Sequence, residues 1–331
     1  RCLLPLENNF LASGSDDSFF RIWNLKDRKI RDSFNKDNGG HSNQIRDLIS
    51  IGNNHLSTAS LDGSIKVWKV NENETRLIST FDSTNGGHTQ AVVRLAVSGS
   101  YLMSGSADST VKIWNKQNLN QIELKYTFDK SKGGHSGLVT SIVPLENNKI
   151  ATGSNEIKIW NLNNGSLDFT FNSTKSVFSD PINFLIKNGQ YLIATSSSPN
   201  FSVPGIIKVF DVNKLELQWT LDDKNGGHSS FIFDLTNLGD SCKIASASAD
   251  RTIKIWNVIS GKLEKTLTGH TDIVWITKYL GNSRLVSGSG DIEGTTGELN
   301  VWDIKSGKIL QTFSQKNGDL VSGSVDHDIK P

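Results

Sequence analysis

The sequence predicts an all-β fold, a seven-bladed β-propeller of four-stranded antiparallel blades, and three observations support this expectation. Short runs that end in tryptophan recur along the chain, at Trp23, Trp68, Trp114, Trp160, Trp256 and Trp302. They are spaced by 45 or 46 residues, except for one gap of 96 that spans two periods. A fixed period of this length is typical of propellers and solenoids. The runs alternate apolar with polar residues, which predicts strands, and no stretch keeps a helical period.

The gap of two periods contains a further copy, in which "GIIKVFD" places Phe210 where the other copies have tryptophan. Seven copies are therefore present. Each contains four predicted strands, which in the second copy cover residues 45–51, 55–60, 64–68 and 76–81. Asn, Asp and Gly separate these strands, as expected for turns. Four strands suit one blade, and closing the blades into a ring leaves only short, protected edges.

Seven complete copies occupy residues 1–313, which we predict to form the propeller domain. Residues 314–331 hold the second strand, the turn and the beginning of the third strand of another copy. Too few residues precede Ser322 for an innermost strand. We interpret the segment as an incomplete eighth repeat or tail, loosely attached outside the ring, and expect the natural polypeptide to continue or a repeat to be partly deleted.

Charge and cysteine content narrow the function classes. The chain has 331 residues, with 35 Lys plus Arg against 34 Asp plus Glu, so we expect no basic surface for nucleic acid or anionic membranes. Two cysteines, Cys2 and Cys242, are too few for a disulfide framework or a thiolate zinc site. No apolar run is long enough to span a membrane. We expect a cytoplasmic or nuclear protein that needs no cofactor or metal.

Most copies also carry a Gly-His pair at a similar distance before the tryptophan. The tryptophan follows the histidine by 27, 26, 25, 28 and 32 residues, for His41, His88, His135, His228 and His270. An aspartate precedes the tryptophan by six residues in four copies, at Asp17, Asp62, Asp108 and Asp250. In these motifs, over about residues 1–313, the sequence resembles the WD-repeat β-propeller family.

The recurrent His, Ser or Thr, and Asp are the residue types of a hydrolase triad, but an active site needs such a triad only once. The family resemblance implies instead a buried hydrogen-bonded tetrad, completed by the tryptophan, in each blade. A buried histidine and a buried carboxylate must satisfy each other, which gives the set a structural role. We expect no catalytic residue. The predicted tetrads are His41, Thr58, Asp62 and Trp68; His88, Ser104, Asp108 and Trp114; and His228, Ser246, Asp250 and Trp256.

Three copies depart from the pattern. The fifth lacks the Gly-His pair and the turn aspartate and has a long inner loop, "SSSPNFSVPG", so we expect it to be the least stable blade or the one most adapted to a partner. The fourth, with "GSNEIKIW", is two residues shorter and also lacks the aspartate. The seventh contains "DIEGTTGE", in which Asp291, Glu293 and Glu298 suggest either a cation site or, as we favour, a solvated hairpin loop.

The start of each innermost strand is expected to line the mouth of the central channel. These positions lie five residues after each Gly-His histidine, and aligning "INFLIK" with the other copies adds Asn183. The residue after a turn aspartate is expected to point near the same face. They predict a partner-binding surface on the top face that contains Arg46, Asn183, Phe233, Arg251 and Trp275. Exposed aromatic residues with arginine are typical of binding hot spots. The alternative is that Phe233 and Trp275 pack beneath neighbouring loops.

These features predict a non-enzymatic scaffold that binds a protein or peptide partner, as a monomeric propeller within a larger protein or complex. One alternative is recognition of phosphorylated or acidic motifs, because Arg1, Arg46 and Arg251 are expected to converge on the channel mouth. The family that the sequence resembles includes ubiquitin-ligase substrate receptors and signalling sensor domains. A propeller enzyme is less favoured, because the repeat uses nearly all histidines and leaves only His55 and His327 isolated.

Overall fold

The computed structural model describes residues 2–171, 180–198, 200–239, 242–292, 296–316 and 319–324. In these ranges the strands form seven antiparallel sheets, and short 3-10 turns are the only helical elements. The fold is a seven-bladed β-propeller, which confirms the fold class that the repeat predicts. The chain divides into two compact units, Arg1–Thr170 and Phe171–Pro331.

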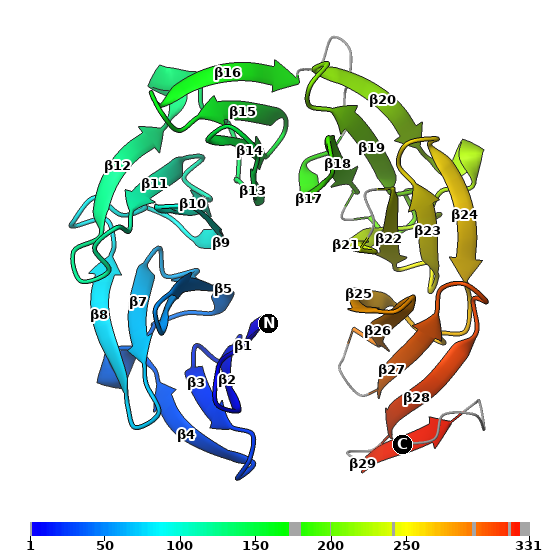
Figure 1. Cartoon of the computed structure of the whole chain (residues 1–331), viewed down its shortest axis with the longest axis horizontal. Helices are drawn as coiled ribbons and strands as arrows, with labels where there is room; N and C mark the ends of the chain where they lie inside the picture. The colour runs from blue at the N-terminus through cyan, green and yellow to red at the C-terminus, as the bar shows by residue number, and fades with distance from the viewer. Residues whose placement is uncertain are drawn as a thin grey trace. The chain divides into compact units, whose positions relative to one another are not determined.

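The first unit holds four sheets, each with its strands side by side in chain order (Figure 1). In each sheet the first strand lies innermost and the fourth outermost (Figure 1). The sheets consist of β1 (Cys2–Pro5), β2 (Phe10–Gly14), β3 (Phe20–Asn24) and β4 (Lys29–Phe34); β5 (Ile45–Gly52), β6 (His55–Ser60), β7 (Ile65–Val70) and β8 (Thr75–Phe81); β9 (Val92–Ser98), β10 (Tyr101–Ser106), β11 (Val111–Asn115) and β12 (Glu123–Phe128); β13 (Ser141–Pro144), β14 (Lys149–Gly153), β15 (Ile157–Asn161) and β16 (Ser166–Phe171).

The second unit holds the other three sheets, which follow the same order. The last of them has a fifth strand at its outer edge. The sheets consist of β17 (Ile182–Asn188), β18 (Tyr191–Ser196), β19 (Ile206–Asp211) and β20 (Glu216–Leu221); β21 (Ile232–Asn237), β22 (Lys243–Ser248), β23 (Ile253–Asn257) and β24 (Lys262–Leu267); β25 (Val274–Gly281), β26 (Arg284–Gly290), β27 (Thr296–Asp303), β28 (Ile309–Lys316) and β29 (Asp319–Ser324).

Within each unit, the core lies between neighbouring blades, whose first strands are in contact. Small residues on the second strands allow this approach. A Cβ added to Gly105 of β10 would lie 2.8 Å from Val139, just before the first strand of the next blade. Gly14 faces Ile45 in the same way, at 2.5 Å. Larger side chains at these glycines would push the blades apart, because a packed interior has no spare volume.

The recurrent tryptophan packs against the end of the preceding blade's fourth strand. The ring-centroid distances are 4.8, 4.5 and 4.3 Å for the pairs Phe34–Trp68, Phe81–Trp114 and Phe128–Trp160. In the second unit a leucine replaces the phenylalanine: Leu221 shares a buried cluster with Trp256, and Leu267 shares one with Trp302. All five of these indole rings are almost completely buried. Each of these five blades therefore buries its largest side chain against its predecessor.

Three of the loops that precede the Gly-His histidines contain a 3-10 turn, namely η1 (Lys36–Asn38), η2 (Lys130–Lys132) and η3 (Asp223–Asn225). Before η3, the Asp222 side chain accepts a hydrogen bond from Lys224 N. Gly226 then adopts a left-handed φ of 84°, and Gly227 N donates to Asp222 O at 2.7 Å. These loops are compact turns that satisfy their own backbone groups.

The described part of the C-terminal segment joins the seventh sheet. β29 pairs antiparallel with β28, from Lys316↔Asp319 to Gln311↔Ser324. This differs from the loosely attached tail that we expected. The free edge of β28 offers unpaired backbone groups, and a hairpin can use them without an innermost strand. The predicted start of a third strand falls in residues 325–331, outside the described residues.

The substitution Gly227→Ala tests the closed form of the loop before the sixth blade. A Cβ at this position would lie 2.3 Å from Asp222 O, a backbone atom that cannot move without opening the loop. We expect the free energy of unfolding, measured by urea denaturation, to fall by more than about 1 kcal/mol. Gly297→Ala is the control, because a Cβ there meets nothing within 4 Å. Equal stability of the two variants would contradict the close approach.

Candidate functional site

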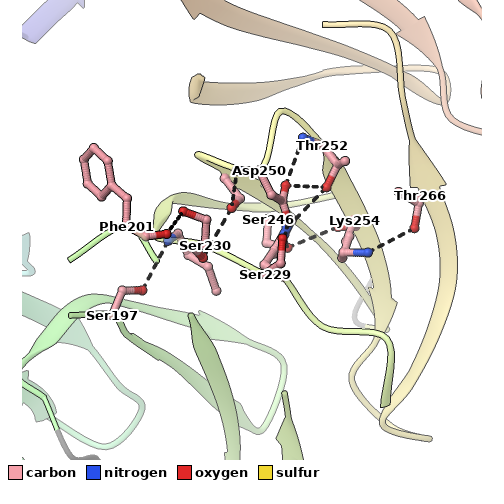
Figure 2. Close-up of polar contacts among 12 residues, drawn as sticks. Ser197, Phe201, Ser229, Ser230, Ser246, Asp250, Thr252, Lys254 and Thr266 are labelled. Atoms are coloured by element: carbon pink, nitrogen blue, oxygen red, sulfur yellow. Dashed lines mark hydrogen bonds and ion pairs between the residues drawn. The ribbon is translucent and has the colours of Figure 1, made fainter. Parts of the chain in front are cut away.

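The sixth blade brings together the four residues of a predicted tetrad. His228 Nδ1 lies 2.7 Å from Asp250 Oδ2, and His228 Nε2 lies 2.7 Å from Ser246 Oγ. Trp256 Nε1 donates to the same serine oxygen at 2.9 Å. Thr252 Oγ1 donates to the other oxygen of Asp250 at 2.6 Å (Figure 2). The network therefore connects the loop before the blade to its second and third strands.

The carboxylate determines the direction of each hydrogen bond in this network. Ionised Asp250 only accepts, so His228 donates from Nδ1, and its Nε2 accepts from the Ser246 hydroxyl. Burial raises the pKa of Asp250, but the hydrogen bonds from His228 and Thr252 outweigh this effect and lower the pKa to about 2. Burial lowers the pKa of His228, against the attraction of Asp250. Ser246 is fully buried, so its hydroxyl is not presented to a substrate.

The second and third blades repeat this geometry. Their His–Asp distances are 3.0 and 2.9 Å, and their His–hydroxyl distances are 2.7 and 2.8 Å. The tryptophan donates to the hydroxyl at 3.0 Å in both blades. The two sets are His41, Thr58, Asp62 and Trp68, and His88, Ser104, Asp108 and Trp114.

The fourth and seventh blades supply the carboxylate from another position, which the sequence analysis missed. Glu298 Oε1 lies 2.9 Å from His270 Nδ1. The interpretation of Glu298 as part of a solvated loop is wrong, because the residue belongs to β27. In the fourth blade, Glu156 lies 3.6 Å from His135 Nδ1, which has no hydrogen-bond partner in the structure described, and 3.3 Å from Lys158 Nζ. Both glutamates stand four residues before the tryptophan, where the other Gly-His copies have Ser or Thr. In both copies this glutamate occurs where the turn aspartate is missing, and that combination can be recognised in the sequence.

The fifth blade replaces the tetrad with apolar residues. Phe210 stands in the place of the tryptophan and packs on Phe171, with ring centroids 4.7 Å apart. The register pairs Ala194 with Lys208, which puts alanine where other blades have the hydroxyl. Replacing all polar partners together avoids stranding one of them in the core. Thr195, at the next position, is buried, and its Oγ1 has no hydrogen-bond partner in the structure described.

The loop between β18 and β19 ties the fifth blade to the sixth instead (Figure 2). Ile232 N donates to Ser197 Oγ at 3.2 Å, and Ser230 Oγ donates to Phe201 O at 2.5 Å. Gly205 N donates to Ser230 O at 3.0 Å. These hydrogen bonds hold Phe201 against the beginning of the sixth blade.

Four aromatic rings from the fifth, sixth and seventh blades contact one another, and we call them the aromatic patch: Phe201, Phe231, Phe233 and Trp275. Centroid distances are 5.8 Å for Phe201–Phe233, 4.6 Å for Phe231–Phe233 and 4.3 Å for Phe233–Trp275. Phe201 is 39% exposed, and the other three are partly buried. The rings pack against each other and beneath the loop, yet the patch reaches solvent. Sequence analysis missed Phe201 and Phe231, because neither occupies a position defined by the repeat.

Arg251 and Asn183 lie near the aromatic patch. Arg251 is exposed, on a tight turn with a left-handed φ of 67°. The turn is bonded to the patch, because Ala249 N donates to Phe231 O at 2.9 Å. The Asn183 side-chain oxygen, in the orientation that satisfies its neighbours, accepts from Ser197 N at 3.3 Å. Asn183 thus contacts the loop that carries Phe201.

Arg46 belongs to the first unit. Its Nη1 donates to Gln44 Oε1 at 3.3 Å and lies 4.0 Å from Asp16 Oδ1. Arg1 lies outside the described residues. The convergence of Arg1, Arg46 and Arg251 therefore stays a prediction.

Asp234 sets the spacing of the two strands that carry Phe233 and Trp275. Its Oδ2 accepts from Thr277 N at 2.8 Å and lies 3.2 Å from Thr277 Oγ1. Burial raises the pKa of Asp234 to about 6, although the hydrogen bonds from Thr277 oppose the shift. The two adjoining rings are therefore held by a buried carboxylate that binds the neighbouring strand.

The described part of the chain contains no group of three or more His, Cys, Asp and Glu side chains placed to hold a metal ion. A cavity of about 830 Å³ lies at the opposite end of the first unit's blades, among turns that include Asn53 and Asn71. Across it, Asn8 Nδ2 donates to Glu72 Oε1 at 2.8 Å. Within the described ranges, no helix has the length and apolar character required to cross a membrane.

The fold and the tetrads define a repeat propeller, and comparison with known proteins gives the family of the repeats. Four segments match the family described as WD domain, G-beta repeat: residues 2–24, 33–69, 76–115 and 216–257. These segments are WD repeats, and in them the chain matches the WD-repeat β-propeller family.

Its relatives share only part of their length with it. The ribosome biogenesis protein YTM1 of Vanderwaltozyma polyspora is 35% identical over 92 residues, which are 28% of this chain and 17% of that protein. Protein tipD of Dictyostelium discoideum is 29% identical over 156 residues, or 42% of this chain and 24% of that protein. Denticleless protein homolog A of Xenopus laevis is 27% identical over 113 residues, or 34% and 16%. The chain thus matches less than a quarter of the length of each of these relatives.

A solved structure supports the fold alone. The crystal structure of the computationally designed Ika8 protein superposes with a TM-score of 0.73 at 22% sequence identity. The match covers 98% of this chain and 95% of that one.

Two matched substitutions test the replacement of the tetrad in the fifth blade. Thr195→Val removes a buried hydroxyl without a partner, so we expect stability to rise by about 1 kcal/mol. Thr152→Val removes the hydroxyl that accepts from Trp160 at 2.8 Å and lies 2.7 Å from His135 Nε2. We expect that variant to lose about 1–3 kcal/mol. Urea denaturation measures both, and a loss of stability in Thr195→Val would show that its hydroxyl is satisfied.

The substitution Asp234→Asn tests the raised pKa of this carboxyl. A folded-state pKa above the unfolded one contributes stability at low pH that is lost as the pH rises through about 6. As the pH rises from about 4 to about 7.5, the free energy of unfolding of Asp234→Asn should therefore increase by on the order of 1–3 kcal/mol relative to that of the wild type. Unfolding free energies measured across this range would contradict the shift if the difference between the two proteins were constant.

Proposed function

We propose that this chain is a non-enzymatic protein-interaction scaffold whose partner docks on the top face of the propeller. By top face we mean the end of the blades where the loops before the Gly-His histidines lie. The observation that carries the proposal is the aromatic patch, together with the exposed Arg251 on the turn bonded to Phe231. Large aromatic rings and arginine dominate the energetics of protein interfaces. Asn183 and Arg46 are the further proposed contacts.

The chemistry of the repeat supports a binding role more than a catalytic one. In five blades the Gly-His histidine directs Nε2 at a Ser or Thr hydroxyl, at distances from 2.5 to 2.8 Å. Each of these hydroxyls also accepts from the tryptophan of its blade. These hydroxyls are buried, so none of them is presented to a substrate for attack.

The relatives support a general platform. The names of these relatives refer to ribosome biogenesis, mitochondrial division and nuclear distribution, so the shared repeat is not tied to one process. A rigid scaffold with variable loops accommodates such diversity. We propose that the propeller acts as a monomer within a larger assembly in the cytoplasm or nucleus.

Affinity capture from a cell lysate tests the docking face. The intact protein is compared with Arg46→Ala/Trp275→Ala and with the control Trp219→Ala, which removes a 38% exposed tryptophan on β20. We expect proteins captured by the intact chain and the control to be lost or reduced at least about tenfold with the double variant. The melting temperature of each protein is measured, to confirm that all three are folded at the temperature of capture. Capture of the same proteins by all three would refute docking on the top face.

A further inference from the structure

We infer that the partner presents a bulky apolar side chain next to an acidic residue, in a short linear segment that lies on the aromatic patch. The inference rests on the proposed function and specifies the chemistry of its ligand. It follows from which groups of the patch are already committed to internal contacts and which remain free to bind.

The polar groups around the aromatic patch are used within the protein. Trp275 Nε1 donates to Gly290 O at 2.9 Å, so this indole presents its ring but not its N–H. Ser230 Oγ donates to Phe201 O, and Ser197 Oγ accepts from Ile232 N. A ligand that depended on hydrogen bonds from these groups would have to break an existing bond for each one it made, with little net gain.

Apolar side chains contribute to the exposed surface at this place. Phe201 is 39% exposed, and Val203 on the same loop is 38% exposed. Both belong to the long insertion of the fifth blade, which is held in place by hydrogen bonds to the sixth blade. A preorganised apolar surface favours an aliphatic or aromatic side chain, because it is already ordered before the partner binds.

The charge of this surface indicates which kind of partner residue lies beside the partner's apolar side chain. Among the described residues of the loops and strand starts that form this surface (197–205, 228–233, 249–252 and 273–276), Arg251 is the only Lys or Arg. Asp250 is committed to His228 at 2.7 Å, so the exposed charge in these ranges is that of Arg251, on the turn bonded to Phe231. Asp291 follows Gly290, which Trp275 contacts from the seventh blade. One guanidinium pairs well with one carboxylate, whereas phosphate recognition generally uses a cluster of arginines. The surface therefore fits an acidic residue better than a phosphorylated one.

The experiment begins with selection from a phage-displayed library of random linear peptides, using the full chain as bait. Selected peptides are synthesised with a fluorescent label, each with a second form that carries phosphoserine in place of its acidic residue. Affinities are then measured by fluorescence anisotropy. We expect the selected peptides to share a bulky apolar residue with Asp or Glu beside it, and the phosphorylated forms to bind no more tightly.

The variants locate the binding site and distinguish the contribution of the aromatic rings from that of the Arg251 charge. Trp275→Ala and Phe233→Ala should weaken binding at least about tenfold, Arg251→Ala should weaken it several-fold, and raised salt should do the same. Trp275→Phe should keep most of the affinity, because it retains an aromatic face. Trp219→Ala, the matched control, should bind like the wild type. Melting temperatures and near-ultraviolet circular dichroism identify variants that fail to fold.

Two contrary results have different meanings. Tighter binding of phosphorylated forms that is lost in Arg251→Ala but kept in Trp275→Ala would overturn the inferred ligand chemistry and leave top-face docking intact. Failure to select any peptide, or peptides that bind the patch variants and Trp219→Ala equally, would overturn the inference and remove the support that the patch gives to the proposed function.

Discussion

The indole of the recurrent tryptophan is the contact on which the architecture depends. Its N–H donates to the buried hydroxyl of its own blade, while its ring packs on the end of the preceding blade's fourth strand. In the third blade, Trp114 donates to Ser104 at 3.0 Å and stacks near Phe81 at 4.5 Å. One side chain therefore couples hydrogen bonding within a blade to packing between blades. Repeats that share a core in this way gain most of their stability from their neighbours.

The tetrad tolerates change when its polar partners change together. In the seventh blade Glu298 supplies a carboxylate to His270 from the third strand, and Asn300 adds a contact at 3.2 Å from the same histidine. In the fifth blade alanine and phenylalanine replace the hydroxyl and the indole, so the core loses hydrogen bonds without stranding their partners. A buried polar group is stabilised by a hydrogen-bond partner, which different residues can supply. Thr195 Oγ1 and His135 Nδ1 lack such a partner in the structure described.

The fifth blade also shows how a departure from the repeat creates an individual surface. It has lost its own tetrad, and its long loop is bonded to the sixth blade through Ser197 and Ser230. The same loop places Phe201 beside Phe233, which an ordinary short turn would not reach. A propeller can vary such a loop because the strands beneath it remain unchanged. The proposed docking surface thus lies where the sequence is least repetitive.

The sequence by itself determined the parts of this protein that repeat. Seven copies at one period, with strand alternation and a Gly-His to Trp spacing, were enough for the propeller class and for the three tetrads of the second, third and sixth blades. Each repeat must bury the same faces against its neighbours, so the same residues recur at the same offsets. Counting five residues from each Gly-His histidine also placed Phe233 and Trp275 at the starts of neighbouring blades.

Only the tertiary structure decided what lies outside the repeat. Glu298 looked like part of a solvated turn until its strand placed it against His270. Phe201 belongs to a loop whose path depends on hydrogen bonds to another blade, and β29 pairs with a strand edge that no local pattern marks. These contacts join residues far apart in the chain through geometry particular to one place, so they leave no periodic trace that the sequence could show.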